Sequence, residues 1–476
     1  MLPNHPDYIT TIYALIKLRA IWIPVNVHLR GPSLKYVLLH AEPVAMIVDT
    51  RYHDVIAQLD ADVLPPVQIW RGFDRTPGNE GTHLFTDVVA HPSDEPPRAS
   101  ARPDDILCIS YTSGTTGEPK GVMVTDKMLR CCAMGAILGG DIRDGDVLFV
   151  WEPLYHIAGI EIVILALLRR VTIALSERFS ASRFWDDVRR VGATHIHYVG
   201  GILQILLKQP TRNDDSQNSV RVAWGGGSTP EAWVEFERRF GVQIRELYGL
   251  TEASSISTIN VEGRVGSIGR AAPYFEIRLV DELGIDVPLG SLGEIVIRER
   301  ERGLLMPGYF RNSEESMRAL RGGELFTGDL GRMDEDGFLY YSGRKKDSVR
   351  RRGENISSWE VERIVNEHPD VELSALIGVP SDIGDMDLKI FVKRVDGRQP
   401  DPEQLINWCE TAMPYFQVPR YVAYVADFEL TPTQRIRKES LSRATDDCWD
   451  RERARTDNST SKTRSTSLNV GNKEEK

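Results

Sequence analysis

The sequence predicts an α/β protein in three parts. A large N-terminal domain of parallel-rich sheets with helices carries a small barrel-like subdomain, and a small mobile α+β domain follows at the C-terminus. Three observations predict this: short runs of Val, Ile and Leu alternate with helix-period segments, glycines punctuate alternating segments after about residue 265, and helix and strand alternate again beyond residue 352. The runs expected to be buried strands are residues 44–48, 106–111, 147–151, 171–175, 194–199 and 220–224.

The helices between these strands have recognisable ends. Ser180 is placed to cap a helix over residues 183–191, and Gly192 follows its last residue. Pro230 opens a second helix over residues 231–240. Because strand, helix and strand repeat in this order, we expect parallel sheet layers with helices packed on them.

The rest of the chain predicts a barrel-like part, a linker, a small domain and a tail. Residues 294–298 alternate as in an antiparallel or barrel-like strand. Residues 343–352 include six Lys or Arg and are expected to form a linker. The small domain should contain elements at 359–368, 371–379, 388–392, 402–413 and 421–424. The predicted boundaries are 1–342 for the large domain, 343–353 for a hinge, 354–446 for the small domain and 447–476 for a disordered tail.

Composition disfavours several classes of function. The chain has 476 residues, a formal net charge of −11 and a pI near 5.5. Sequence-independent binders of nucleic acid or anionic membranes need a dominant positive field, which this chain lacks. Five cysteines without a CxxC pair do not predict a disulfide framework or a structural zinc site. No apolar run reaches ~18 residues and the first residues lack a basic region, so we expect a cytoplasmic protein with reduced thiols.

The most informative segment is residues 111–121, Tyr-Thr-Ser-Gly-Thr-Thr-Gly-Glu-Pro-Lys-Gly. Its glycines let the backbone approach a polyphosphate, consecutive N–H groups can form an anion nest, and its hydroxyls add donors. The P-loop pattern of NTPases ends in Gly-Lys-Ser/Thr, whereas Lys120 lies between Pro119 and Gly121. The segment therefore predicts a phosphate-binding loop of another kind, although a short stretch of Ser, Thr and Gly alone is more often an ordinary turn.

This segment resembles the phosphate loop of the adenylate-forming enzymes, the family of acyl-CoA synthetases, luciferases and peptide-synthetase adenylation domains. Further motifs match in the family's order over about residues 1–445. They are 151–156 (Trp-Glu-Pro-Leu-Tyr-His, the substrate loop), 225–230 (Gly-Gly-Gly-Ser-Thr-Pro, the adenine loop), 248–252 (Tyr-Gly-Leu-Thr-Glu), 327–330 (Thr-Gly-Asp-Leu, the ribose motif) and 343–347 followed by Gly353 (the hinge motif).

The resemblance implies that ATP and a carboxylic acid form an acyl-adenylate with release of pyrophosphate, after which a thiol displaces AMP. Phosphoryl transfer of this kind depends on positioning and charge neutralisation. Thr251 would donate to the α-phosphate, and Glu252 would coordinate Mg²⁺, which prefers oxygen ligands. The implied nucleotide contacts are Thr112, Ser113, Gly114, Thr115, Thr116, Gly117, Lys120, Gly225, Gly226, Gly227, Tyr248, Gly249, Thr251, Asp329, Arg344 and Gly353.

Other roles are implied by the same motifs. Lys346 would be the pivot of the small domain, with Arg344 reaching the nucleotide and Gly353 lining the passage for the thiol arm. Glu252 alone could instead be an acid at a helix N-terminus, and Asp329 alone an acid in a Gly-Asp turn. His156 could gate the acyl site or be a packed histidine beside a turn.

Two departures from the family pattern stand out. The family has Thr-Pro-Thr-Gly-Lys-Ile near its C-terminus, where the lysine bridges the carboxylate and the α-phosphate; this chain has Gln434 and Arg435 in place of the glycine and lysine. Because a guanidinium is larger and planar, we expect Arg435 to slow adenylation more than thioester formation. The chain also begins within the family's first subdomain, and Arg19 lies where a glycine is usual, so we expect the first elements to be missing.

The acyl pocket should lie between His156 and Trp224, with Tyr198, Val199 and Gly200 as further candidates. Residues 179–185 and 352–356 most resemble the crotonobetaine/carnitine-CoA ligase branch, whose trimethylammonium group would suit an aromatic face such as that of Trp224. The leading hypothesis is an ATP- and Mg²⁺-dependent ligase that transfers a small acid to coenzyme A. No nucleic-acid partner is expected, and a homo-oligomer is left open. The alternatives are transfer to a carrier protein or to oxygen, or a non-enzymatic nucleotide- or acyl-CoA-binding remnant.

Overall fold

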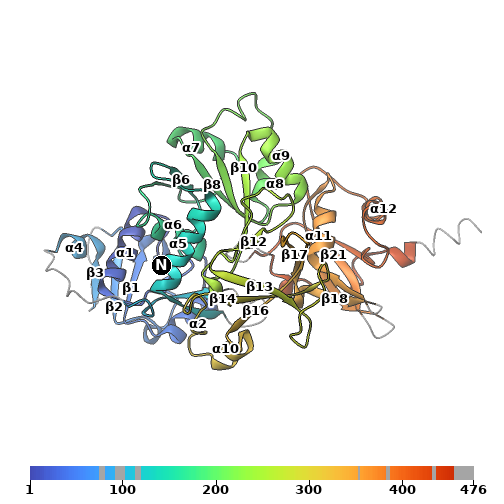
Figure 1. The fold of residues 1–476 in the computed structure, drawn as a ribbon. Helices are drawn as coiled ribbons and strands as arrows, with labels where there is room; N and C mark the ends of the chain where they lie inside the picture. Colours follow the sequence, from blue (N-terminus) through green and yellow to red (C-terminus); the bar gives the residue numbers. More distant parts are fainter. Residues whose placement is uncertain are drawn as a thin grey trace, which may run out of the picture. The chain divides into compact units, whose positions relative to one another are not determined.

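The computed structural model describes residues 1–73, 81–91, 102–112, 119–351, 354–381, 386–430 and 436–454. These residues divide into two compact units. The first contains Met1–Thr327 and Arg332–Tyr341, and the second contains Gly328–Gly331 and the described residues from Ser342 onward. Figure 1 shows the elements of both units in sequence colours. Within the described ranges, no helix is long and apolar enough to cross a membrane.

The first unit is built on a seven-stranded sheet in the order β12-β11-β10-β9-β8-β6-β7. The pairs among β6 to β10 are parallel, and β11 and β12 add antiparallel strands at one edge. The strands are β6 (Val147–Val150), β7 (Thr172–Leu175), β8 (His195–Val199), β9 (Val222–Gly226), β10 (Gln243–Tyr248), β11 (Thr258–Ile259) and β12 (Arg270–Ala271).

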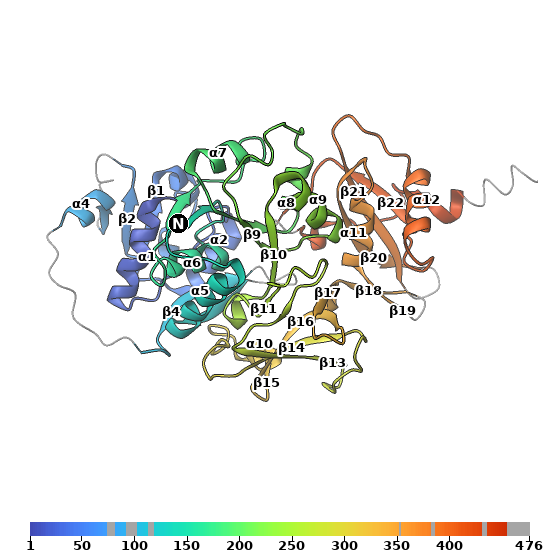
Figure 2. The same ribbon diagram turned by 45° about the horizontal axis from the view of Figure 1, so that its top comes forward.

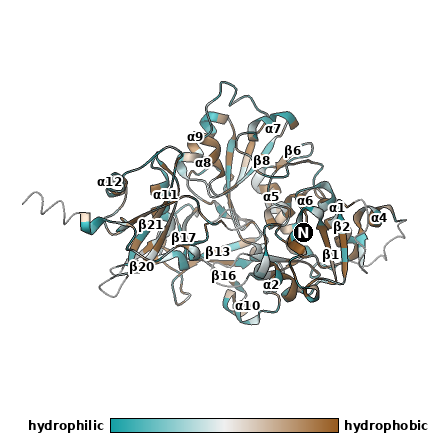
Figure 3. Ribbon diagram, turned by 180° about the vertical axis from the view of Figure 1, so that it is seen from behind, coloured by the Kyte–Doolittle hydropathy of each residue, from teal (hydrophilic) through white to brown (hydrophobic). Residues whose placement is uncertain are grey.

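Helices cover this sheet because its strands are apolar on both faces. Leu148 and Val150 of β6 join one core with helices α5 and α6, whereas Phe149 between them joins a second core with α7, α8 and α9. Full burial of one such side chain contributes about 1.5–3 kcal/mol to folding. Figure 2 shows α8 and α9 beside the sheet, and in Figure 3 the outer helix α7 is largely hydrophilic. The helices are α5 (Asp126–Gly140), α6 (Ile157–Leu165), α7 (Phe184–Val191), α8 (Ile202–Leu207) and α9 (Pro230–Phe240).

Most of the predicted elements are confirmed, with one wrong helix cap. All six predicted strands are present within two residues of their expected ends, and α9 begins at Pro230 behind a Thr229 cap. Ser180 does not cap α7: its carbonyl accepts from the N–H of Arg183 in a preceding turn, and Arg183 is itself the N-cap. Gly192 ends α7 in the left-handed conformation, as expected.

Three smaller sheets accompany this large sheet, and most of their residues belong to the first unit; Gly328–Gly331 of β16 and the last residues of β17, from Ser342, belong to the second. A parallel sheet β1-β2-β3 carries the N-terminal helices, a two-stranded antiparallel sheet joins β4 and β5, and a five-stranded sheet β13-β14-β16-β15 with β17 beside β16 forms the barrel-like subdomain. Their elements are α1 (Pro6–Leu18), α2 (Gly31–Ala41), β1 (Ala45–Asp49), α3 (His53–Ile56), β2 (Val67–Arg71), β3 (Thr82–Leu84), α4 (Phe85–Ala90), β4 (Ile106–Thr112), β5 (Lys120–Thr125), β13 (Phe275–Val280), β14 (Gly293–Glu299), α10 (Ser313–Ala319), β15 (Leu320–Arg321), β16 (Glu324–Met333) and β17 (Leu339–Arg344).

The second unit is the predicted α+β domain. A four-stranded sheet β20-β21-β22-β23 packs with helices α11 and α12 around a core of its own, and β18 pairs with β19. The elements are β18 (Ser348–Arg351), β19 (Glu354–Ser357), α11 (Ser358–Asn366), β20 (Val371–Pro380), β21 (Met386–Arg394), α12 (Pro402–Ala412), β22 (Tyr421–Val425) and β23 (Trp449–Asp450). The α/β class with an appended α+β domain is therefore confirmed.

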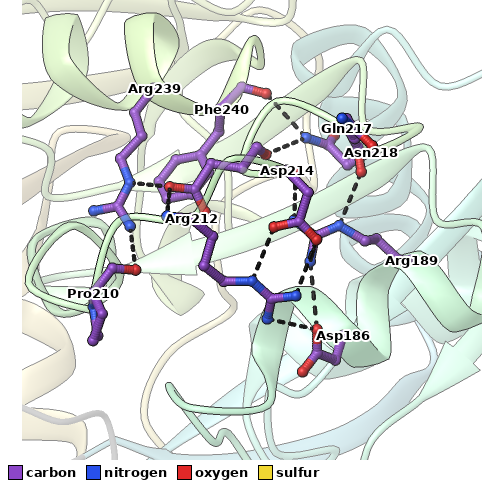
Figure 4. Close-up of polar contacts among 10 residues, drawn as sticks. Asp186, Arg189, Pro210, Arg212, Asp214, Gln217, Asn218, Arg239 and Phe240 are labelled. Atoms are coloured by element: carbon purple, nitrogen blue, oxygen red, sulfur yellow. Dashed lines mark hydrogen bonds and ion pairs between the residues drawn. The ribbon is translucent and has the colours of Figure 1, made fainter.

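A network of ion pairs fixes the long connection between α8 and β9 (Figure 4). The buried Arg239 guanidinium of α9 pairs with Asp215 at 2.7 Å and donates to the carbonyl of Leu207. Arg189 of α7 donates to the carbonyl of Asp214, and Arg212 pairs with both Asp214 and Asp186. Since its arginines are matched by carboxylates and carbonyls of the connection and of the neighbouring helices α7 and α8, this network stabilises the fold.

Candidate active site

The predicted phosphate loop joins two antiparallel strands. Thr112 at the end of β4 pairs with Lys120 at the start of β5, so the two ends of the loop lie side by side. A P-loop instead connects a strand to a helix. Here helix α5 begins only after β5, where the hydroxyl of Thr125 accepts from the N–H of Met128. The local topology therefore agrees with the sequence in setting this loop apart from the NTPase motif.

A segment from the barrel-like subdomain lies alongside β5. The N–H of Phe310 donates to the carbonyl of Gly121 at 2.7 Å, and the N–H of Met123 donates to the carbonyl of Gly308. The same segment reaches Glu252, since the N–H of Met306 donates to the carbonyl of that residue at 2.8 Å. Backbone hydrogen bonds thus hold the end of the phosphate loop close to the Tyr-Gly-Leu-Thr-Glu motif.

Side chains of this region meet around Tyr309. The Lys120 ammonium lies 5.2 Å from the centroid of the Tyr309 ring, and the Tyr309 hydroxyl donates to Oε1 of Glu252 at 2.9 Å. Lys120 also pairs with Glu315 of α10. The hydrogen bond from Lys120 lowers the pKa of Glu315, while burial opposes this shift. The structure therefore brings together two sequence-predicted residues, Lys120 and Glu252, through Tyr309, which no sequence motif had singled out.

Glu252 is the residue that the motif predicts as a magnesium ligand. It lies with Thr251 in a short 3-10 turn, η3 (Thr251–Ala253), and both residues are buried. Within the described ranges, no group of three or more His, Cys, Asp or Glu could hold a metal. A site with one protein carboxylate suits Mg²⁺, which commonly takes one or two carboxylates together with substrate phosphates and waters.

The turn after Glu252 explains why the motif contains a glycine. Ser254 and Ser255 both have positive φ values, 52° and 67°, in a conformation that is rare for residues other than glycine. A Cβ on Gly249 would lie 1.8 Å from the carbonyl oxygen of Ser255. The Ser255 hydroxyl donates to the buried Glu161 of α6 at 2.6 Å, which fastens the turn. Gly249 is required here by backbone packing.

The predicted adenine loop is fastened by Glu246 of β10. This buried carboxylate accepts from the N–H groups of Gly227, at 2.6 Å, and Ser228, and also from the hydroxyl of Tyr198, at 2.5 Å. Burial raises its pKa to about 7, although these hydrogen bonds act in the opposite direction. A Cβ on Gly225, whose φ is 154°, would lie 1.8 Å from the carbonyl oxygen of Tyr198. The sequence signal that could have identified Glu246 is its place two residues after Ile244, which puts an acid on the same strand face as a buried apolar residue.

The acyl-pocket candidates lie at the carboxyl end of β8, in the middle of β9 and before α6. His156 is half-buried, and its Nδ1 accepts from the N–H of Ala158 as the cap of α6. Trp224 is buried, with its ring edge-on to His197. His197 in turn bonds Glu152 at 2.6 Å, and both are buried. Gly200 has a positive φ of 55° and follows Val199, the last residue of β8.

The ribose and hinge motifs meet in the second unit. Nε of Arg344 lies 3.2 Å from Oδ1 of Asp329, which is buried on β16. Lys346 is exposed in the 3-10 turn η4 (Lys345–Asp347) that follows β17. The predicted ribose acceptor and the predicted nucleotide-reaching arginine are therefore neighbours. Several predicted residues lie outside the described part of the chain: Ser113, Gly114, Thr115, Thr116, Gly117, Gly353 and Arg435.

Comparisons with known proteins assign the family. Residues 1–310 match the family model described as AMP-binding enzyme, and residues 360–435 match the model described as AMP-binding enzyme C-terminal domain. The chain belongs to the AMP-binding enzyme family. The resemblance predicted from the motifs is confirmed, and both matched regions occur in the predicted order.

Curated relatives of this AMP-binding enzyme are named CoA ligases. A crotonobetaine/carnitine–CoA ligase of Salmonella agona is 29% identical over 454 residues, which cover 92% of this chain and 87% of the relative. An indoleacetate–CoA ligase of Aromatoleum aromaticum is 29% identical over 448 residues, with coverage of 92% and 86%. The predicted likeness to the crotonobetaine/carnitine branch is therefore confirmed, while a relative named for an aromatic acid is equally similar in identity.

Solved structures of adenylate-forming ligases share the fold. An anthranilate CoA ligase in complex with anthranoyl-AMP superposes with a TM-score of 0.83 at 24% identity, covering 92% of this chain and 85% of that one. ATP-bound MatB from Rhodopseudomonas palustris gives a TM-score of 0.79 at 25% identity, with coverage of 92% and 86%. The AMP-binding fold of this chain is thus one that holds ATP in a solved relative.

Proposed function

We propose that this AMP-binding enzyme is an ATP- and Mg²⁺-dependent acid–thiol ligase that converts a small carboxylic acid into its coenzyme A thioester. A carboxylate oxygen attacks the α-phosphorus of ATP, giving an acyl-adenylate and pyrophosphate. The sulfur of coenzyme A then attacks the acyl carbon, its proton is lost, and AMP leaves. The observation that carries this proposal is the convergence of Lys120, Tyr309 and Glu252, because a cation and a buried carboxylate meet at the end of the predicted phosphate loop, which supports the binding of magnesium-bound phosphates there.

Each proposed role follows from the chemistry of the residue. Lys120 and the loop Thr112–Gly117 would bind the β- and γ-phosphates, and Thr251 would donate to the α-phosphate. Glu252 would hold Mg²⁺, which supplies charge neutralisation at the phosphate oxygens when bound. Asp329 would accept from the ribose hydroxyls, and its pairing with Arg344 supports a shared place at the nucleotide.

The remaining nucleotide contacts are proposed on the motifs. The loop Gly225–Gly227 and the segment Tyr248–Gly249 would contact adenine, and Glu246 supports the first of them by holding the N–H of Gly227. Lys346 would act as a hinge residue within 343–353, and Gly353 would line the path of coenzyme A. Arg435 would take the place of the family's lysine.

The acid itself is proposed to be small and to bind near His156 and Trp224, with Tyr198, Val199 and Gly200 close by. Betaine-like and aromatic acids lead the candidates because the relatives are named for crotonobetaine or carnitine and for indoleacetate. A trimethylammonium group or an aromatic ring would both find favourable contacts with an indole face.

Pyrophosphate release tests the function. Short, medium, aromatic and betaine-like acids are incubated with ATP and Mg²⁺, with and without coenzyme A, and both pyrophosphate and acyl product are measured. We expect acid-dependent pyrophosphate release, and a thioester only with coenzyme A. Release without thioester formation would favour delivery to a carrier protein or to oxygen. No release with any acid, although ATP binds, would favour a nucleotide-binding remnant.

A further inference from the structure

Glu315 lies where it can compete for the lysine of the phosphate loop. Its Oε2 pairs with the Lys120 ammonium, and its Oε1 lies 2.6 Å from Nη1 of Arg318. The N–H of Glu315 donates to the side chain of Asn312, the cap of α10, so the helix start is held in place. Glu315 is thus a carboxylate fixed beside a residue proposed to bind phosphate.

The Lys120–Glu315 pair is exposed enough for Lys120 to exchange Glu315 for another partner. The side chains of Lys120 and Glu315 are 31% and 26% exposed, so water and a ligand can reach both. Breaking a fully buried pair costs about 3–5 kcal/mol, whereas partly exposed pairs are worth far less. Arg318 also pairs with Glu315, so this carboxylate would keep a positive neighbour if Lys120 turned toward a ligand.

A polyphosphate and the Glu315 carboxylate would compete for the Lys120 ammonium. An ammonium group has three N–H donors, and both phosphate oxygens and a carboxylate accept hydrogen bonds from them. Each bound phosphate also places negative charge close to the Glu315 carboxylate, and the repulsion between the two charges weakens phosphate binding. The tyrosine that supports Lys120 also bonds Glu252, so movement of the ammonium occurs next to the proposed magnesium ligand.

We propose that Glu315 is a positioning residue that competes with polyphosphate for Lys120 and thereby promotes the departure of pyrophosphate. The inference rests on the proposed function and adds a step to it. Glu315 draws Lys120 back as pyrophosphate leaves, by exchange of hydrogen-bond partners without covalent change. Because Lys120 is paired with Glu315, the protein binds pyrophosphate and ATP less tightly than it would if Lys120 had no competing carboxylate.

The test compares Glu315→Gln with Glu314→Gln, a matched control. Glu314 precedes it in α10, is 73% exposed, and pairs with Arg318. Binding of inorganic pyrophosphate with Mg²⁺, and of ATP with Mg²⁺, is measured by calorimetry for the full chain, together with inhibition of the acid-dependent reaction by pyrophosphate. We expect Glu315→Gln to bind pyrophosphate about five- to tenfold more tightly and to show a correspondingly lower inhibition constant, with Glu314→Gln within about twofold of wild type.

Two further readouts separate this role from a purely structural one. The gain in affinity should shrink at about 0.5 M salt, because screening weakens the charge repulsion that the substitution removes. The KM for ATP should fall while kcat does not rise, since tighter pyrophosphate binding cannot speed its release. Unchanged or weaker pyrophosphate binding in Glu315→Gln, with wild type binding normally, overturns this inference alone. Failure of wild type to bind either ligand overturns the proposed function as well.

Discussion

The Tyr309 hydroxyl donates to Oε1 of Glu252 at 2.9 Å, although 57 positions separate the two residues in the chain. The bond joins the barrel-like subdomain to the motif that follows β10. It orients the carboxylate proposed to bind Mg²⁺, while the ring of the same tyrosine faces the Lys120 ammonium.

Replacement of Tyr309 by Phe is therefore expected to impair catalysis more than folding. Hydrogen bonds to charged groups contribute about 1.5–3 kcal/mol, so we expect kcat/KM for ATP to fall at least about tenfold. Steady-state pyrophosphate release measures the effect. The matched control is Tyr340→Phe, which removes a similar bond to Asp334, 3.0 Å long, from the turn between β16 and β17. Equal losses in both variants would contradict a role for Tyr309 at the site.

Gly249 should not tolerate a side chain. In Gly249→Ala, the new Cβ would meet the Ser255 carbonyl oxygen at 1.8 Å, so the turn that carries Thr251 and Glu252 must shift. We expect pyrophosphate release to fall at least about 100-fold, since small displacements of positioning groups cost this much. Gly241→Ala is the control: Gly241 also ends a structural element, with φ 69°, but nothing lies within 4 Å of its added Cβ. That variant should lose about 1 kcal/mol of stability and keep its activity. Retained activity in Gly249→Ala would show that the turn adapts.

The sequence was sufficient to predict the elements and the motif positions, because both depend on local pattern. The apolar runs at β6, β8 and β9 and the start of α9 at Pro230 are encoded within a few residues. The Ser180 prediction failed because a serine before a helix can also precede an intervening turn, and the chain makes that turn at Arg183.

Partners contributed by distant segments could not be predicted. Neither Tyr309 nor Glu315 belongs to a motif recognised in the sequence. They come close to Lys120 because the segment that includes residues 308–310 runs beside β5. Glu161 is an acid in the apolar helix α6, and Glu246 is an acid on a strand face shared with the buried Ile244; such positions signal a buried polar partner without identifying it. Glu246 holds the predicted adenine loop, and Glu161 holds the turn that follows Thr251 and Glu252.

Glu161 should make stability depend on pH near neutrality. Burial raises its pKa from its usual value near 4.5 to about 7, with His197 and Ser255 opposing the rise and Glu152 adding to it. The folded state therefore holds this proton more tightly than the unfolded state. The contribution of protonated Glu161 to the free energy of unfolding is complete below about pH 4.5 and is lost as the pH rises through 7. We expect the free energy of unfolding of wild type, relative to Glu161→Gln, to fall by about 2–3 kcal/mol between pH 5 and pH 8.

Urea unfolding at both pH values measures this difference. Glu246, whose pKa is also raised to about 7, contributes in the same direction in both proteins and cancels in the comparison. Glu235→Gln serves as control, because Arg238 lowers the pKa of this exposed carboxyl and its titration lies below the range. A difference between wild type and Glu161→Gln that stays constant with pH would refute the assignment.

Arg435→Lys is expected to accelerate adenylation. Lys438, the next lysine in the chain, cannot substitute for the family's lysine while its ammonium pairs with Glu362 of α11 at 2.6 Å, a carboxylate oxygen that also accepts the N–H of Leu376. Arg435 lies where the family has its lysine and is expected to act in its place, and a planar guanidinium is a poor replacement for a compact ammonium at a close-fitting site. Pyrophosphate release should be faster in Arg435→Lys, while conversion of a synthetic acyl-adenylate to thioester changes little. Arg437→Lys, whose side chain pairs with Glu429, is the control and should leave both rates unchanged. If pyrophosphate release in Arg435→Lys is equal to wild type or slower, then the arginine supports adenylation as well as a lysine would.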